Sequence, residues 1–180
     1  IKKQAEKISE FNSKHLFSRV FLKKKSWFTL NVIGSKNDPI ESIAEQIDQS
    51  VNEHWVSKGI PPSLKTKTKK TVAGVIKSLK NLSIELHKKD HGLILMVDEM
   101  GKFLDFASSV GSDLNLFQEI AENFSNLRLN KEADPVFIGI LHQPFEEYAS
   151  SLGRSVQEDW QKIQGRFEDI PFSINSEETA

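Results

Sequence analysis

Two kinds of feature are missing from the sequence, and each absence removes a class of protein. The 180 residues contain no cysteine, so the chain forms neither disulfides nor thiolate metal sites. No apolar run approaches the ~20 residues that cross a bilayer as a helix. These absences favour a reducing compartment, which we expect to be the cytoplasm, and they predict no membrane partner.

The composition is typical of a folded globular chain. Apolar residues make up 38% of the sequence and charged residues 27%, and 180 residues suit one domain with a substantial core. The chain opens at Ile1 with a charged stretch that resembles neither a start codon nor a signal peptide. We therefore expect residues 1–180 to be a single partial domain with a cut end.

Charge is distributed unevenly along the chain. Residues 1–90 hold 18 of the 24 Lys and Arg but only 9 of the 25 Asp and Glu. Residues 91–180 hold the other 6 Lys and Arg and the other 16 Asp and Glu. A basic half can indicate a nucleic acid partner, although charge blocks are more often solvated faces or complementary surfaces within one protein. Both interpretations stay open. The lysine-rich run at 65–70 is explained equally well by phosphate contact and by an exposed loop.

The order of periodic segments predicts alternating helices and strands. We expect a helix at about 1–20 followed by a strand and a helix in residues 1–57, an exposed basic connection at 58–70, a helix in 71–92, and the remaining elements in 93–180. Those remaining elements are strands at 93–97, 136–141 and 167–172, with helices at 114–127 and 155–165 between them. This order favours an α/β fold with a mostly parallel sheet flanked by helices.

Local signals support single elements of this order. Asp38 followed by Pro39 is typical of a helix N-terminus, and Ser112 can cap a later helix. The continuous apolar runs at 93–97 and 136–141 are typical of parallel strands that are covered on both faces. Each run ends abruptly in polar residues, which is where open parallel sheets bind ligands.

The first of these polar ends carries two adjacent acids, Asp98 and Glu99. Two carboxylates directly after an apolar strand form the Walker B arrangement, in which the first acid holds Mg²⁺ through water and the second polarises the attacking water. Asp98 is therefore the candidate metal and cofactor ligand, and Glu99 the candidate catalytic base. The alternative is that the two acids merely open a loop.

Three longer segments carry a resemblance to a known family. Residues 96–104 read Met-Val-Asp-Glu-Met-Gly-Lys-Phe-Leu, residues 141–149 read Leu-His-Gln-Pro-Phe-Glu-Glu-Tyr-Ala, and residues 160–172 read Trp-Gln-Lys-Ile-Gln-Gly-Arg-Phe-Glu-Asp-Ile-Pro-Phe. These three segments resemble sequences of large bacterial P-loop ATP-binding proteins related to the AAA+ class, members of which often occur among defence or DNA-processing genes. The likeness covers most of residues 91–172, whereas residues 1–90 match only in the order of elements. It implies a three-layer P-loop NTPase-like core with ATP and Mg²⁺ as cofactors.

The resemblance also implies a sensor position after the strand at 136–141. Gln143 is the first choice for this role and His142 the second, because a neutral polar side chain can touch the γ-phosphate or orient water without neutralising Glu99. For His142 the alternative is an imidazole that is hydrogen-bonded to neighbouring backbone. Lys102 can approach phosphate too, but a surface or structural lysine after a turn at Gly101 is the simpler interpretation.

Arg166 lies in a Gly-Arg-Phe-acid motif. By the same resemblance, this motif precedes the last core strand. The likeness implies an arginine finger that acts across a subunit boundary, and therefore self-association. A guanidinium suits this role because it stays charged and addresses two phosphate oxygens at once. The alternative is a local ion pair with Glu168 or Asp169.

The phosphate loop of such enzymes is missing from the sequence, since no Gly-x-x-x-x-Gly-Lys-Ser/Thr motif occurs. The segment from Gly34 to Lys36 is too short to be this motif. We expect this loop immediately upstream of Ile1. The predicted function is therefore the core fragment of an ATPase whose Mg²⁺-dependent hydrolysis drives conformational change, in defence or DNA processing, with the fragment inactive alone. The alternative is a non-catalytic nucleic-acid-binding or scaffolding module with an ATPase-like fold.

Overall fold

The computed structural model describes residues 24–110, 115–143 and 164–170, together with single residues 147, 157 and 161. The helices predicted at 1–20 and 155–165 and the cap at Ser112 fall wholly or mostly outside these residues. Within them the fold is α/β, with a three-stranded parallel sheet and flanking helices. None of the helices in this part of the chain is long and apolar enough to cross a membrane.

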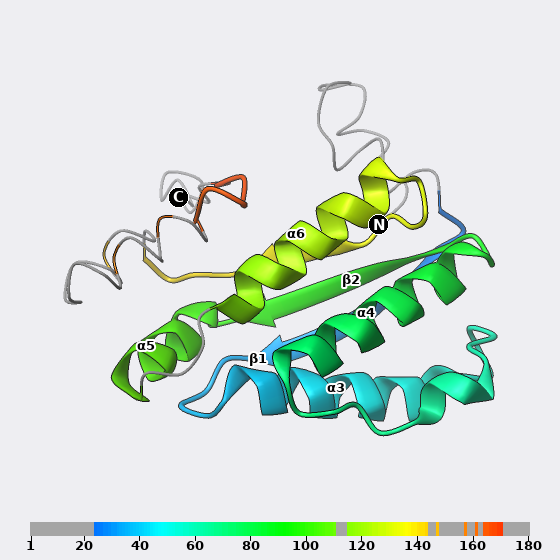
Figure 1. The fold of residues 1–180 in the computed structure, drawn as a ribbon, viewed down its shortest axis with the longest axis horizontal. Helices are drawn as coiled ribbons and strands as arrows, with labels where there is room; N and C mark the ends of the chain where they lie inside the picture. The colour runs from blue at the N-terminus through cyan, green and yellow to red at the C-terminus, as the bar shows by residue number, and fades with distance from the viewer. Residues whose placement is uncertain are drawn as a thin grey trace, which may run out of the picture.

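The sheet has the order β1-β2-β3 (Figure 1). Its strands are β1 Ser26–Ile33, β2 His91–Asp98 and β3 Val136–Gly139. Both pairings are parallel, with Ser26 opposite His91 and Ile33 opposite Asp98 at the two ends of the β1–β2 ladder. The acidic end of β2 therefore lies at the centre of the carboxyl edge of the sheet.

The burial of each strand follows from its place in the sheet. On β1, at the edge of the described sheet, Phe28, Leu30 and Val32 are buried while the intervening Thr29 and Asn31 are exposed. On β2, residues 92–95 are buried without alternation, so side chains on both faces of this part of the strand are covered. The apolar run at 93–97 thus predicted the central strand correctly.

The helices are α3 Pro39–His54, α4 Val72–His87, α5 Met100–Val110 and α6 Asn115–Leu129, with a 3₁₀ turn η1 at Pro62–Lys65. Helices α3, α4 and α6 form a layer on the face that carries Phe28, Leu30 and Val32, whereas α5 lies beyond the carboxyl end of β2 (Figure 1). Helix α4 contacts α3 on one side and α6 on the other, and α3, α4 and α6 lie against β1, β2 and β3 respectively (Figure 1). The predicted cap is confirmed, because the side chain of Asp38 accepts a hydrogen bond from the backbone N–H of Ile40 at 2.7 Å.

Two local predictions were wrong. Gly101 was interpreted as a turn, but it lies inside α5, which begins directly after Glu99. The physical reason is that Met100, Phe103 and Leu104 recur at helical spacing and are all buried. Residues 167–170, predicted to begin a strand, have no regular secondary structure.

The basic connection between α3 and α4 is tied to α3. The hydroxyl of Thr68 donates to Oδ1 of Asp48 at 2.6 Å, and the backbone N–H of Thr68 donates to the same oxygen at 2.9 Å. Lys70 forms ion pairs with Glu41 and Glu45 on α3, at 3.1 and 2.9 Å. The connection is exposed along most of its length, but these contacts fix its path.

A buried lysine joins three segments at the amino edge of the sheet. Lys24 is only 7% exposed, and its ammonium lies 2.9 Å from Oδ2 of Asp134 and 3.0 Å from Nδ1 of His87. These residues come from the start of β1, the end of α4 and the loop before β3. Because a buried cation needs a compensating charge, Asp134 stabilises the junction of the three segments.

We expect Asp134→Asn to lower the free energy of unfolding by about 2–3 kcal/mol, because the Lys24 ammonium would stay buried without its carboxylate. Urea unfolding measures the change. Glu132→Gln is the control, since Glu132 is exposed and two residues away. Equal stability of the two variants would contradict the assigned role of Asp134.

Candidate active site

The carboxyl ends of the three strands meet at one edge of the sheet, where the two predicted acids lie. Asp98 is the last residue of β2, and Glu99 is the single residue between β2 and α5. Two residues, Ile140 and Leu141, separate His142 from the end of β3. The sheet therefore brings Asp98, Glu99 and His142 together from two neighbouring strands.

The backbone of the acidic turn is held from both sides. The N–H of Gly34, after β1, donates to the carbonyl of Asp98 at 2.7 Å. On the other side, the N–H of Ile140 donates to the carbonyl of Val97 at 2.9 Å, and the N–H of Met100 donates to the carbonyl of Ile140 at 3.0 Å. These three hydrogen bonds fix where the chain leaves β2 and enters α5.

Glu99 has a backbone conformation that non-glycine residues rarely adopt. Its φ is +51°, in the left-handed region, which costs on the order of 1–2 kcal/mol for an L-residue. The conformation persists because Gly34 and Ile140 hold the turn. Gly34 is required at its position, since a Cβ there would lie 2.7 Å from the carbonyl carbon of Glu99 and closer still to its oxygen. Strain of this kind is often found at functional sites.

The side chain of Asp98 is half-buried and keeps one oxygen unused by the described residues. Its Oδ1 accepts a hydrogen bond from the backbone N–H of Glu99 at 2.8 Å, and Oδ2 has no protein partner in the described part of the chain. No group of three potential metal-ligating side chains occurs among these residues. A single carboxylate is the kind of ligand that Mg²⁺ uses together with water and substrate phosphates.

The carboxylate of Glu99 is held by two basic side chains. The ammonium of Lys102, one turn into α5, donates to its Oε2, and Nε2 of His142 lies 3.5 Å from its Oε1. The hydrogen bond from Lys102 is the main cause that lowers the pKa of Glu99. Partial burial opposes this shift, while the charge of Lys102 and the contact with His142 add to it. Glu99 is therefore an ionised, hydrogen-bonded carboxylate at neutral pH.

The two sensor candidates differ in what they contact. His142 is 68% exposed, and its imidazole lies beside Glu99. Gln143 is exposed and forms no hydrogen bond with the described residues. Lys102, for which a surface or structural role was the simpler interpretation, is the closest partner of Glu99.

Arg166 lies in an ion pair that sequence analysis did not anticipate. Its Nη2 is 2.6 Å from Oε1 of Glu122 on α6, and its side chain is 49% exposed. The alternative partners, Glu168 and Asp169, form no ion pair with it in the described part of the chain. No contact joins Arg166 to the acidic turn there.

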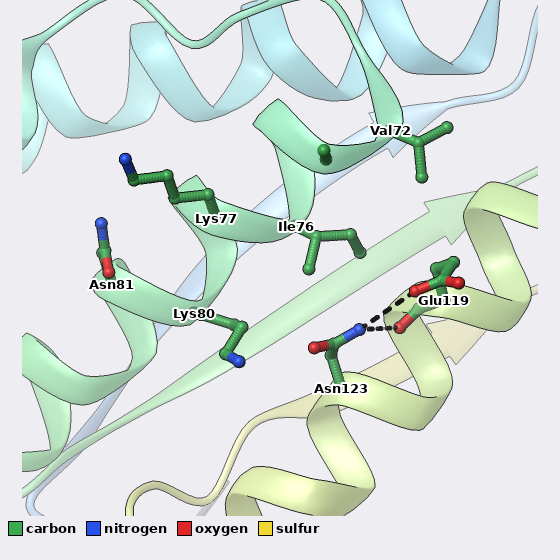
Figure 2. A pocket seen from close by; sticks show the side chains of 8 residues that line it. Val72, Ile76, Lys77, Lys80, Asn81, Glu119 and Asn123 are labelled. Atoms are coloured by element: carbon green, nitrogen blue, oxygen red, sulfur yellow. Dashed lines mark hydrogen bonds between the residues drawn. The ribbon is translucent and has the colours of Figure 1, made fainter.

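A groove elsewhere on the surface is separate from this site. A cavity of about 650 Å³ lies between α4 and α6, and Figure 2 shows the side chains that line it. Its lining is mixed, with apolar, basic, amide and acidic side chains: Val72, Ala73, Ile76, Lys77, Lys80, Asn81, Glu119 and Asn123. The amide of Asn123 donates to the backbone carbonyl of Glu119 at 2.8 Å across one turn of α6 (Figure 2). None of these residues belongs to the acidic turn or contacts it, so the groove does not enlarge the candidate active site.

Gly34 and Lys102 are the site residues whose roles sequence analysis missed. A glycine directly after β1 is the one available signal for the first, because it permits a close backbone approach at the edge of a sheet. The second requires knowledge that α5 begins immediately after Glu99, which places Lys102 three residues along the same turn.

Comparisons of the chain with protein-family models, with curated proteins and with solved structures found no match. The resemblance to P-loop ATPases therefore rests on the motif residues alone. The geometry described above is evidence about this site that does not depend on that resemblance.

We expect Gly34→Ala to disrupt the acidic turn, because the new methyl group would overlap the backbone of Glu99. The free energy of unfolding should fall by about 1–3 kcal/mol, the usual cost of overpacking. Ser35→Ala is the matched control, since it adds no atom near Glu99. Amide chemical shifts measure the local effect: those of residues 97–100 should change in Gly34→Ala and stay unchanged in Ser35→Ala. Wild-type stability in Gly34→Ala would refute the close approach.

We expect Lys102→Met to raise the pKa of Glu99, because the variant removes the main cause of its lowering. Carboxyl ¹³C titration by NMR measures this pKa directly. Lys36→Met provides the control, since Lys36 is an exposed lysine that forms no ion pair with the described residues. An unchanged Glu99 pKa in Lys102→Met would show that the ion pair does not persist in solution.

Proposed function

We propose that the chain contributes the metal-and-water half of an ATPase site, with the phosphate-binding loop supplied from outside these 180 residues. The observation that carries this proposal is the acidic turn: two carboxylates at the end of the central parallel strand, with a backbone fixed by three hydrogen bonds. A loop that merely follows a strand needs neither the strained φ of Glu99 nor a glycine packed against it. When bound, Mg²⁺–ATP would supply the phosphoryl group and most of the metal ligands.

Asp98 would accept a hydrogen bond from a metal-bound water through Oδ2, the oxygen that the described residues leave unused. Its other oxygen already bonds the N–H of Glu99, and this bond fixes the orientation of the carboxylate. A fixed carboxylate orients water better than a mobile one, because the ordering entropy is lost on folding and not during turnover.

Glu99 would orient and polarise the attacking water. A carboxylate has about four acceptor positions, and Lys102 and His142 occupy two of them, so that acceptor capacity remains for water. The lowered pKa of Glu99 makes it a weak base, which suits a residue that positions water in a loose phosphoryl-transfer transition state. In this account His142 acts on Glu99, whereas Gln143 remains the candidate for phosphate contact.

A further strand can complete the site. Within the described sheet, β1 and β3 are edge strands, and each can accept a parallel neighbour. A parallel strand ends at the same edge as β2, so a loop that follows it would approach Asp98. We propose that a segment outside these 180 residues provides this strand and its phosphate loop.

Arg166 would act across a subunit boundary only after it leaves Glu122. The ion pair is half-exposed, and such pairs contribute little to stability, so exchange of Glu122 for a phosphate is energetically accessible. This role requires self-association of the intact protein.

The non-catalytic alternative has an observation of its own. Five lysines of the α3–α4 connection and of α4 form no ion pair with a carboxylate of the described residues: Lys65, Lys67, Lys69, Lys77 and Lys80. A scaffold that binds nucleic acid would use such side chains for phosphate contact.

ATP turnover by a longer polypeptide that begins upstream of Ile1 tests the proposed function. We expect Glu99→Gln to lower kcat by at least about 100-fold while nucleotide binding is retained, because the variant removes the group that polarises water. Glu132→Gln is the control and should turn over normally. Wild-type turnover by Glu99→Gln would reject the assigned role, and absence of ATP binding by the longer polypeptide would favour the scaffold.

The same assay tests Arg166. Arg166→Ala should lower turnover. Mixing Arg166→Ala subunits with Glu99→Gln subunits should restore part of it, because a site with an intact Glu99 then receives Arg166 from its Glu99→Gln neighbour. If turnover stays equally low after the two variants are mixed, the role of Arg166 as an arginine finger is rejected.

A further inference from the structure

A second cluster of polar side chains lies at the amino edge of the sheet, at the opposite end of β2 from Asp98. Ser26 and His91 begin β1 and β2 and are partners in the parallel ladder. The hydroxyl of Ser26 lies 2.8 Å from Nδ1 of His91 and 2.9 Å from the ammonium of Lys58, which follows α3. Serine therefore bridges a histidine and a lysine.

The hydrogen-bond roles in this cluster follow from its chemistry. Lys58 has only donors, so Ser26 accepts from it and directs its own proton to Nδ1 of His91. His91 is then neutral, with its proton on Nε2, an assignment inferred from the network. The remaining N–H groups of Lys58 and the Nε2–H of His91 find no acceptor in the described part of the chain. The cluster thus offers several donors that the described residues leave unused.

The surroundings of the cluster are strongly positive. Burial is the main cause that lowers the pKa of His91, and the charges of Lys58, Lys25 and Lys89 lower it further, against the opposing charge of Asp90. These are the charged groups that face the imidazole. Three cations and one exposed carboxylate leave the cluster with net positive charge.

Lys58 is unusual among the lysines near this edge. It is half-buried, yet no carboxylate of the described residues forms an ion pair with it. By contrast, Lys24 is paired with Asp134 at 2.9 Å and Lys88 with Glu85 at 2.5 Å. A partly desolvated cation without a counter-charge is costly, and a bound anion would remove that cost.

We propose that Ser26, Lys58 and His91 form a binding site for a phosphate group, with Lys25 and Lys89 at its rim. A phosphate group fits because it accepts several hydrogen bonds at once and carries the negative charge that three lysines favour. The eight residues of β2 separate this site from Asp98 by about 23 Å at ~3.3 Å per residue. It is therefore distinct from the proposed ATP site and does not depend on it.

The first test uses inorganic phosphate and the histidine ring ¹H–¹⁵N spectrum of the whole chain, with the resonance of His91 assigned through His91→Gln. At constant ionic strength, phosphate should shift the His91 ring signals saturably and raise the pKa of His91, because a nearby anion favours the imidazolium. Lys58→Met should weaken this binding at least tenfold. Lys88→Met, an exposed lysine of the same edge, should leave it unchanged.

Ser26→Ala keeps every charge but removes the bridge, and it should weaken phosphate binding several-fold. This variant decides the outcome if Lys58→Met does not fold. The proposal is overturned if chloride shifts His91 as phosphate does, or if phosphate binds equally to the wild type and to the folded variants.

A second arm distinguishes a free phosphate compound from a nucleic acid backbone. A fluorescein-labelled 20-base-pair DNA duplex should bind with salt-dependent affinity if the ligand is a backbone phosphate. Lys58→Met should then reduce the slope of log affinity against log salt by about 1. Phosphate binding without duplex binding would assign the site to a small phosphate compound, and failure of both probes to change His91 would end the proposal.

Discussion

The clamp on the backbone of the acidic turn is the constraint on which the rest of this structure depends. Gly34 holds the carbonyl of Asp98 from the β1 side, and Ile140 holds both ends of the turn from the β3 side. The residue after the central strand can therefore have a positive φ, and a helix can begin directly after that residue. The direction of both carboxylates follows from this geometry, and so does the position of Lys102 over Glu99.

The fold and the site have different physical origins. The core forms because one face of the sheet and the inner faces of α3, α4 and α6 are continuously apolar. The polar clusters lie at the two ends of β2, where the apolar sequence stops: the acidic turn at the carboxyl end and the Ser26–His91 pair at the amino end. One strand thus separates an acidic edge, which suits a metal, from a basic edge, which suits an anion.

Much of the fold was predictable from the sequence because it depends on local periodicity. The apolar run at 93–97 indicated the central strand, and Asp38 with Pro39 indicated the start of α3. The acids at the end of β2 were also predictable as a pair. Their partners were not, because the Lys102–Glu99 and Arg166–Glu122 contacts depend on where helices begin and how they pack. Gly101 was misinterpreted for a related reason, since buried neighbours outweigh the low helix propensity of a glycine.

The central claim, that the acidic turn faces a metal-bound triphosphate, is tested most directly by paramagnetic relaxation. Mn²⁺ with a non-hydrolysable ATP analogue would be added to the longer polypeptide, and amide signals would be followed by NMR. The account predicts selective broadening at Gly34, Glu99 and His142, with sharp signals at Ser26 and His91 on the opposite edge. Sharp signals at the acidic turn, or broadening centred on the amino edge, would contradict it.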